Sequence, residues 1–171
     1  GLGKEPPMLL VDASVLIDFA TTDLTVLSLA VRHLGALHVP REVPDEVDQL
    51  DDAACGELGI IVVDGSLEQI TEAGAARGRL SFEDRWCMIL ARDHQWTCVT
   101  NDGALRRACE AGGVLVMWGL QLIRNLVVAE AIAPAAAVTI AEAIGRTNPR
   151  MAPAVVDEFR RQIAGLFPGR P

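Results

Sequence analysis

The sequence is poor in positive charge and contains a single lysine, Lys4. It has 15 Lys plus Arg against 23 Asp plus Glu, which gives a formal net charge of −8. A basic nucleic-acid-binding arm is therefore excluded, because such arms carry runs of positive charge. A disordered chain is excluded as well, because 50% of the residues are hydrophobic. With 171 residues the chain is long enough to bury one sizeable core.

Cysteine pairs and several well-known site motifs are also missing. The cysteines form no C-x-x-C pair and lie in apolar runs, which disfavours zinc-thiolate sites and disulfide scaffolds. There is no G-x-x-x-x-G-K-[ST] motif, so a P-loop is absent. Asp12 is followed by Ala13-Ser14 and not by the x-D of a haloacid-dehalogenase-type phosphatase. We expect four reduced thiols in the core: Cys55, Cys87, Cys98 and Cys109.

No long hydrophobic run is present. A membrane-spanning helix needs roughly 20 mostly apolar residues, and the most apolar region, 126–141, is interrupted by Glu130 and Pro134. The N-terminal segment lacks the pattern of a signal peptide. We therefore expect no membrane association and a cytoplasmic location.

Short apolar runs alternate with helical patterns over the first two thirds of the chain. The predicted strands are 8–11, 37–39, 59–63, 97–100 and 114–117. The predicted helices between them are 24–34, one that begins at Pro44, 66–78, 81–93 and 104–111. Because each parallel strand pair needs a crossover helix, this order predicts a three-layer α/β/α fold with a parallel sheet of about five strands.

The pattern changes after Trp118. Three helical stretches follow without a strand between them, at 121–132, 135–144 and 154–166. We therefore expect an α/β domain over residues 8–118 and a helical C-terminal extension, 119–171, packed on the same domain. Trp118 itself is expected either in the core at a strand end or in an interface between two copies of the chain.

Acidic residues stand where a parallel sheet places its ligands, beyond the carboxyl ends of the strands. Asp12 and Asp102 follow predicted strands, and Glu46 and Asp84 fall in first turns of predicted helices. Each also has a local explanation. Asp12 and Asp102 are suitable helix N-caps, Glu46 suits a helix dipole, and Ser81 with Asp84 matches a capping box.

Asp84 fits the local explanation least well. Cys87, Met88 and Ala91 share its face of the predicted helix, and this apolar face should pack on the sheet. An ionised group buried there without a partner is strongly unfavourable. A metal ion or an arginine such as Arg85 would compensate. If the acids converge, hard cations such as Mg²⁺ are the natural ligand.

Four segments resemble, in order, the four acidic motifs of PIN-domain nucleases. They are 9–17, 43–47, 80–91 and 99–114, within residues 8–117. The resemblance implies an RNA-cleaving fold that depends on Mg²⁺ or Mn²⁺, with the acids at one edge of the sheet. Small stand-alone bacterial members are most often toxins of VapBC-type toxin-antitoxin pairs, which a small DNA-binding antitoxin neutralises.

The resemblance assigns roles to individual residues. The positions that match the acidic quartet, expected to bind the metal and carry catalysis, are Asp12, Glu46, Asp84 and Asp102. The positions expected to bind substrate are Ser14, Thr100, Asn101, Arg85 and Arg107. The implied reaction is hydrolysis of RNA phosphodiesters by metal-activated water. A catalytically idle PIN-like binding module is the alternative, and a homodimer is the expected assembly.

The negative net charge leaves arginine as the source of phosphate contacts. Arg79, Arg85, Arg106 and Arg107 lie close in sequence to the predicted acids, and arginine suits bidentate phosphate binding. Arg106 and Arg107 are equally compatible with the solvated face of a helix. The histidines lie outside the acidic motifs and are expected at the surface or in loops: His33, His38 and His94.

Overall fold

The sheet of this protein consists of parallel strands, and it confirms the expected α/β fold. The computed structural model describes residues 8–41, 47, 50–75 and 78–168. Five strands pair in the order β3-β2-β1-β4-β5. Their bounds are β1 Leu9–Val11, β2 Leu37–Pro40, β3 Ile61–Val63, β4 Thr97–Val99 and β5 Val116–Met117. β1 is central, with Leu10 opposite both His38 of β2 and Cys98 of β4.

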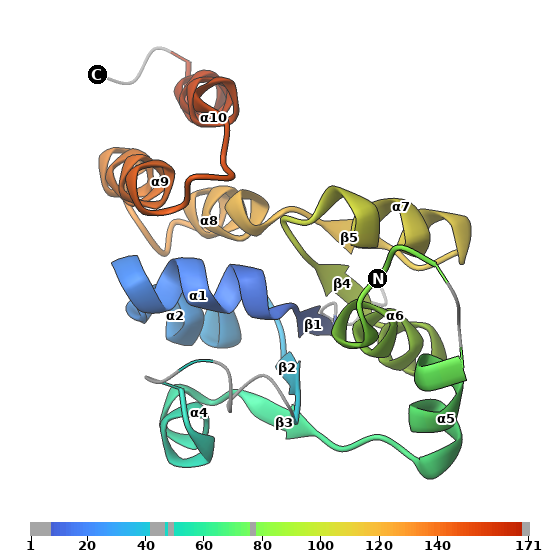
Figure 1. Ribbon diagram of the computed structural model, residues 1–171. Coiled ribbons are helices and arrows are strands. Elements are labelled where there is room, and N and C mark those ends of the chain that lie inside the picture. The colour runs from blue at the N-terminus through green and yellow to red at the C-terminus, as the bar shows by residue number, and fades with distance from the viewer. Residues whose placement is uncertain (1–7, 42–46, 48–49, 76–77, 169–171) are drawn as a thin grey trace, which may run out of the picture.

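Helices cover both faces of the sheet (Figure 1). Alternate residues of β1 face opposite layers, because Leu9 and Val11 belong to one buried cluster and Leu10 to the other. The first layer contains α1 Ala13–Thr22, α2 Thr25–His33, α4 Asp52–Leu58 and α8 Gly119–Val128. The second contains α5 Leu67–Ala75, α6 Phe82–His94 and α7 Gly103–Ala111.

The C-terminal helices extend the first layer. They are α9 Pro134–Thr147 and α10 Pro153–Leu166, and each begins with a proline, whose fixed φ suits a first helical position. Figure 1 shows them beyond α1 and α8, away from the second layer. Ile144 of α9 and Phe159 of α10 are buried in the same cluster as β1. The extension therefore completes the core.

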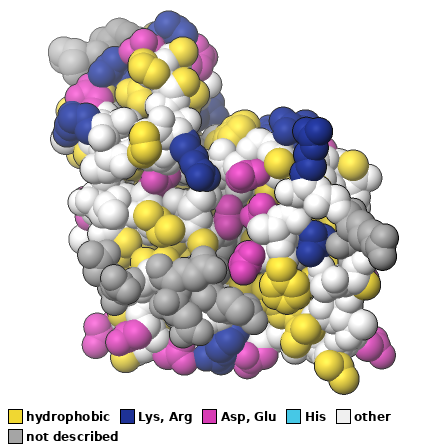
Figure 2. All heavy atoms as spheres, in the orientation of Figure 1, with side chains coloured by type: hydrophobic (Ala, Val, Ile, Leu, Met, Phe, Trp, Pro, Cys, Tyr) yellow, Lys and Arg dark blue, Asp and Glu magenta, His cyan; other side chains and the backbone are white. Residues whose placement is uncertain are grey.

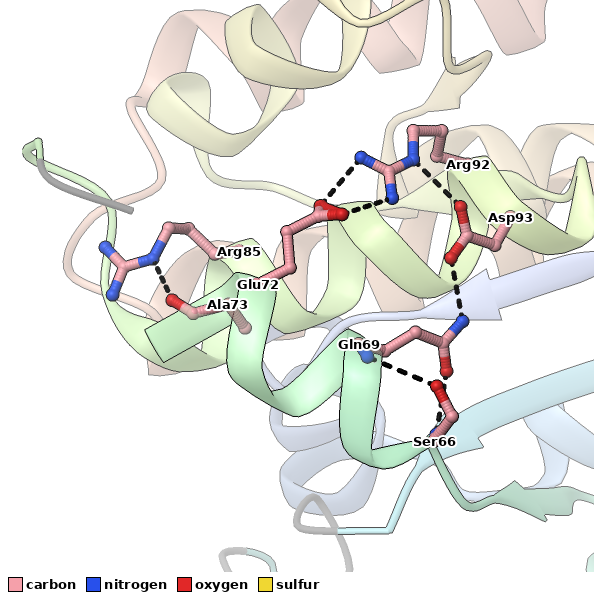
Figure 3. A network of polar contacts seen from close by, with 7 residues as sticks. All are labelled: Ser66, Gln69, Glu72, Ala73, Arg85, Arg92 and Asp93. Carbon is pink, nitrogen blue, oxygen red and sulfur yellow. Dashed lines mark hydrogen bonds and ion pairs between the residues drawn. The ribbon is translucent and has the colours of Figure 1, made fainter. Parts of the chain in front are cut away.

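Polar contacts join α5 to α6 (Figure 3). Arg92 of α6 donates from both terminal nitrogens to Glu72 of α5, at 2.8 and 2.9 Å. Asp93 accepts from Gln69 at 2.9 Å, and Gln69 in turn contacts Ser66 at the start of α5. These exposed pairs fix how α5 lies on α6 while adding little stability.

Some local expectations differ from the structure. α4 was not expected, and it begins with an Asp51 cap and ends at Gly59 in the left-handed region. α8 ends at Val128, four residues before the predicted end, and Glu130 turns the chain with a φ of 58°. His38 is buried within β2, contrary to the surface expectation. The four cysteines are free and buried, as expected.

Within the described residues, no single helix is long and apolar enough to cross a membrane. α1 and α2 reach that length and composition only as a pair, and that pair is bent by 120°.

Candidate active site

The carboxyl ends of β1 and β4 bring two predicted acids to one place. Asp12 follows β1 directly, and Asp102 lies two residues after Thr100, which follows β4. The two strands are neighbours in the sheet. Figure 2 shows acidic side chains gathered near the centre of this face, with basic side chains above them on both sides.

The Thr100 hydroxyl links these two acids. It donates to Oδ2 of Asp12 at 2.8 Å and accepts from the backbone N–H of Asp102 at 3.0 Å. Ser14 Oγ donates to the same Asp12 oxygen at 2.9 Å. Thr100 is fully buried, so this hydroxyl has no solvent to replace either partner. Two predicted substrate-binding residues, Ser14 and Thr100, thus orient the Asp12 carboxylate.

Asp84 joins the group from α6. Burial raises the pKa of Asp84, and the negative charges of Asp12 and Asp102 raise that pKa further. A carboxylate responds to another charge in this way only when the two lie close together. Three of the four predicted acids therefore form one electrostatic cluster, here called the acidic cluster: Asp12, Asp84 and Asp102. Glu46, the fourth, lies outside the described residues.

The local capping explanations hold for part of the cluster. Asp102 caps α7 by accepting from the backbone N–H of Leu105 at 2.8 Å. Ser81 caps α6 by accepting from the N–H of Asp84 at 3.1 Å. Asp12 makes no side-chain cap on α1. Capping thus accounts for the hydrogen bond of one carboxylate oxygen of Asp102. It gives no reason for a carboxylate side chain at positions 12 and 84.

The chemistry of the donor set fits a hard divalent cation. Carboxylate oxygens are the ligands that Mg²⁺ prefers, and this ion is usually bound by one or two carboxylates, with waters completing its shell. Within the described residues, no group of three or more His, Cys, Asp or Glu side chains is arranged to hold a metal ion. Oδ1 of Asp12 has no protein hydrogen bond in the described part of the chain. It is available as a ligand.

The Asn101 side chain links α1 to the start of α8. Its side-chain N–H donates to Asp18 at 2.8 Å, and its Oδ1 accepts from the N–H of Gly119 at 2.9 Å. A Cβ at position 119 would stand 2.9 Å from that oxygen, so glycine permits the close approach. Substrate binding by Asn101 stays a prediction, but both ends of its amide already have protein partners.

The two arginines predicted to bind substrate lie in different surroundings. Arg85 donates to the backbone carbonyl of Ala73 in the last turn of α5 (Figure 3). It also donates to the carbonyl of Leu80, which precedes α6. Arg107 is exposed on α7, with its Nη1 close to Gly103 at the start of that helix. Arg107 is therefore accessible to a phosphate. Arg85 would first have to break its two hydrogen bonds to backbone carbonyls before it could bind substrate.

One buried acid was missed by the sequence analysis. Asp18 on α1 is 5% exposed and accepts from Asn101 and from Asn148, which follows α9. Burial raises the pKa of Asp18, while its two amide donors lower it. Val15 and Phe19, close to it on the same helix, are buried. The helical-face argument applied to Asp84 would have found Asp18 as well.

Trp118 lies at the surface, not in the core as one of the two expectations had it. Its side chain is 38% exposed. The Arg106 guanidinium lies 4.3 Å from the centre of its ring, within the range of a cation–π contact. Arg106 also pairs with Glu110 at 3.2 Å.

Comparisons with known proteins add a likeness of fold. No protein-family model matches the chain, and no curated protein matches its sequence. Among solved structures, it is similar to a PilT N-terminus domain protein from the hyperthermophilic archaeon Sulfolobus solfataricus. The TM-score is 0.51 at 10% identity, over 69% of this chain and 92% of the other. The chain thus has a PIN-like fold.

Proposed function

We propose that this protein is a metal-dependent endoribonuclease. The observation that carries the proposal is the acidic cluster, in which the Thr100 hydroxyl links Asp12 to Asp102. Burial, together with the charges of these two acids, raises the pKa of Asp84. Two carboxylates that follow neighbouring strands and a third from the first turn of α6 repel one another, and a hard cation relieves that repulsion. The PIN-like fold is consistent with a nuclease-type function.

Asp12, Asp84 and Asp102 would hold Mg²⁺ or Mn²⁺, with Glu46 as the expected fourth ligand. When bound, the ion lowers the pKa of a water molecule and stabilises negative charge on the leaving oxygen. Thr100 and Ser14 keep Asp12 in a fixed orientation through its Oδ2. This leaves Oδ1 for the ion. Asp102 is fixed by its cap on Leu105.

Arginines beside the cluster supply the attraction for RNA that the net charge of −8 does not. Arg107 is exposed on α7, and its Nη1 lies close to Gly103, the residue that follows Asp102. Arginine binds phosphate oxygens through two parallel N–H bonds. We expect Arg107→Ala to weaken RNA binding more than it weakens folding; an equal loss of both would contradict this role.

The test is cleavage of a labelled mixed-sequence RNA by the purified protein in Mn²⁺, in Mg²⁺ and in excess EDTA. Asp12→Asn keeps the size of the side chain and an acceptor for Thr100, so it should fold while losing activity. Asp157→Asn, an exposed acid on α10 that pairs with Arg160, is the matched control. Cleavage that needs metal, disappears in Asp12→Asn and persists in Asp157→Asn supports the proposal.

Two results would count against a nuclease. Cleavage that survives Asp12→Asn comes from a contaminant. If the protein does not cleave RNA while Mn²⁺ still raises the melting temperature of wild type and not of Asp12→Asn, the chain is the idle binding module that also fits the motifs.

We further propose that the nuclease is the toxin of a type II toxin-antitoxin pair and acts as a homodimer. A small DNA-binding antitoxin would cover the acidic cluster and place a cation of its own against the carboxylates. Controlled expression in a bacterial host should arrest growth for wild type and not for Asp12→Asn. An active nuclease without effect on growth would contradict the toxin role. Light scattering should give twice the 18.3 kDa of one chain.

A further inference from the structure

A cavity of about 760 Å³ opens beside the acidic cluster. It lies between the residues that follow β4, the start of α8, and α10 with the segment before it. Its lining residues include Ser14, Asp102, Trp118, Arg150, Val155 and Phe159. Its volume is within the range of small-molecule sites, roughly 300 to 1,000 Å³. It is thus large enough for one nucleoside.

The cavity is continuous with the candidate active site. Asp102 belongs to the acidic cluster and also lines the cavity, and Ser14 lines the cavity while its hydroxyl donates to Asp12 at 2.9 Å. A nucleic acid with a phosphate at the acids would therefore have an adjacent nucleotide at the mouth of this cavity.

The charges in the cavity favour the uncharged base of that nucleotide over its phosphate. Its ionic lining residues are Asp102, Glu158 and Arg150, two carboxylates against one guanidinium. With Asp102 assigned to the metal site, Glu158 and Arg150 balance each other, so the rest of the cavity has no net positive charge that would attract a phosphate in preference to a neutral ring. Arg150 has room for a backbone phosphate, because its side chain is exposed.

The apolar lining offers a stacking surface. Trp118 and Val155 are 38% and 47% exposed, and both line the cavity. Arg106 lies over the Trp118 ring at 4.3 Å and holds it in place. Every base has a π face that stacks on such a ring without regard to sequence. Amides of Gln121 and Gln162 also line the cavity and suit the polar edges of a base.

We propose that this cavity holds one unpaired nucleobase of single-stranded RNA, next to the phosphate bound at the acidic cluster. The inference rests on the proposed ribonuclease function and specifies its substrate class. A base in a duplex is stacked and paired and does not reach such a cavity unless it is unstacked. α10 thereby gives the C-terminal extension a part in substrate recognition.

The test compares binding of a labelled single-stranded RNA with binding of an abasic RNA of the same length. All proteins carry Asp12→Asn in the full chain, in Mg²⁺ at low salt, so that no cleavage occurs. Val155→Trp fills the cavity, and Val128→Trp places the same side chain on α8 outside it, where Val128 is 55% exposed. Fluorescence anisotropy gives the affinity of each protein for each RNA.

Loss of base stacking weakens affinity by about 5- to 160-fold per base. We expect Val155→Trp to weaken binding of the RNA within this range and to leave binding of the abasic RNA unchanged. Val128→Trp should change neither affinity. Trp118→Ala should act like Val155→Trp, and Trp118→Phe should retain part of the affinity. A melting curve for each variant verifies that it is folded.

Three outcomes would overturn the proposal. The first is unchanged RNA affinity in Val155→Trp, and the second is an equal loss for both RNAs. The third is a change of oligomeric state with no change in RNA affinity, which would make the cavity an interface between copies. Wild-type cleavage in Mn²⁺ is measured separately. Cleavage without base-dependent binding removes this inference alone, and base-dependent binding without cleavage removes the proposed catalysis alone.

Discussion

The hydroxyl of Thr100, at the end of β4, donates to the carboxylate of Asp12, at the end of β1, across 2.8 Å and 88 residues of sequence. Thr100 is fully buried and also accepts from the N–H of Asp102. Thr100→Val keeps the shape and removes the hydroxyl, which leaves both partners short of a hydrogen bond. We expect a loss of about 1 to 3 kcal/mol in the free energy of unfolding.

Urea unfolding measures that loss, and Thr100→Ser is the control because it keeps the hydroxyl. The valine variant should also cleave RNA more slowly than the serine variant, since Asp12 loses one of its two donors. A valine variant as stable and as active as wild type would show that this hydroxyl is dispensable.

Asp84 should reduce the stability of the metal-free protein. Burial and the charges of Asp12 and Asp102 raise its pKa above the ordinary value of about 3.8, so the folded state favours the protonated form. Protonated Asp84 therefore stabilises the folded state relative to ionised Asp84. This stabilisation is complete at pH values below the pKa of Asp84 in the unfolded chain, and it is lost as the pH rises through the pKa of Asp84 in the folded protein. In EDTA, Asp84→Asn should therefore be more stable than wild type at pH 7, and the difference should disappear near pH 3.

Glu83→Gln is the control for Asp84→Asn, because Glu83 occupies the same first turn of α6 and is exposed. An acid there interacts favourably with the helix dipole, so Glu83→Gln should leave stability unchanged or slightly reduced. Denaturant unfolding at several pH values gives both curves. If Asp84→Asn is no more stable than Glu83→Gln at pH 7, the acidic cluster is not under electrostatic strain.

Asp18 and Asn148 connect the C-terminal extension to α1. Asn148 donates to both carboxylate oxygens of Asp18, at 3.1 and 3.3 Å, over 130 residues of sequence. A double-mutant cycle with Asp18→Ala and Asn148→Ala should give a coupling energy of about 1 kcal/mol, because each single change removes the partner of the other. Strictly additive losses would mean that the pair contributes nothing to docking of the extension.

Local patterns in the sequence account for the strand order along the chain and for three of the predicted acids. Asp12 and Asp102 follow short apolar runs, and Asp84 shares a helical face with apolar residues, so neighbouring residues alone reveal them. The prediction that these acids converge came from the family resemblance. Local patterns could not supply it, because β1 and β4 are neighbours in the sheet although two strands lie between them in the sequence. No short window of sequence encodes that pairing.

Features that depend on distant partners were not predictable. The role of Asn148 depends on Asp18, and that of Asn101 on Gly119, and neither pair has a local pattern. α4 was missed for a different reason. It is a helix of 7 residues with Cys55 as its buried residue, so it has no apolar periodicity. Its cap at Asp51 and its glycine end at Gly59 were the available indications.

Gly65, which precedes α5, lies close to the buried Trp86 of α6. A Cβ at position 65 would stand 1.6 Å from the Trp86 ring, which is far too close for any packed atom. Trp86 is 2% exposed and packed in the core of the second layer, so it has little room to move away. We expect Gly65→Ala to lower the free energy of unfolding by about 1 to 3 kcal/mol through overpacking.

Gly74, inside α5, is the matched control, because a Cβ there meets nothing within 4 Å. Gly74→Ala should stabilise the protein by up to about 1 kcal/mol, since alanine loses less backbone entropy in a helix. Denaturant unfolding followed by tryptophan fluorescence measures both changes and also reports on Trp86. Effects of the same sign in the two variants would mean that Gly65 responds as an ordinary glycine, and that the close approach of Trp86 does not restrict this position.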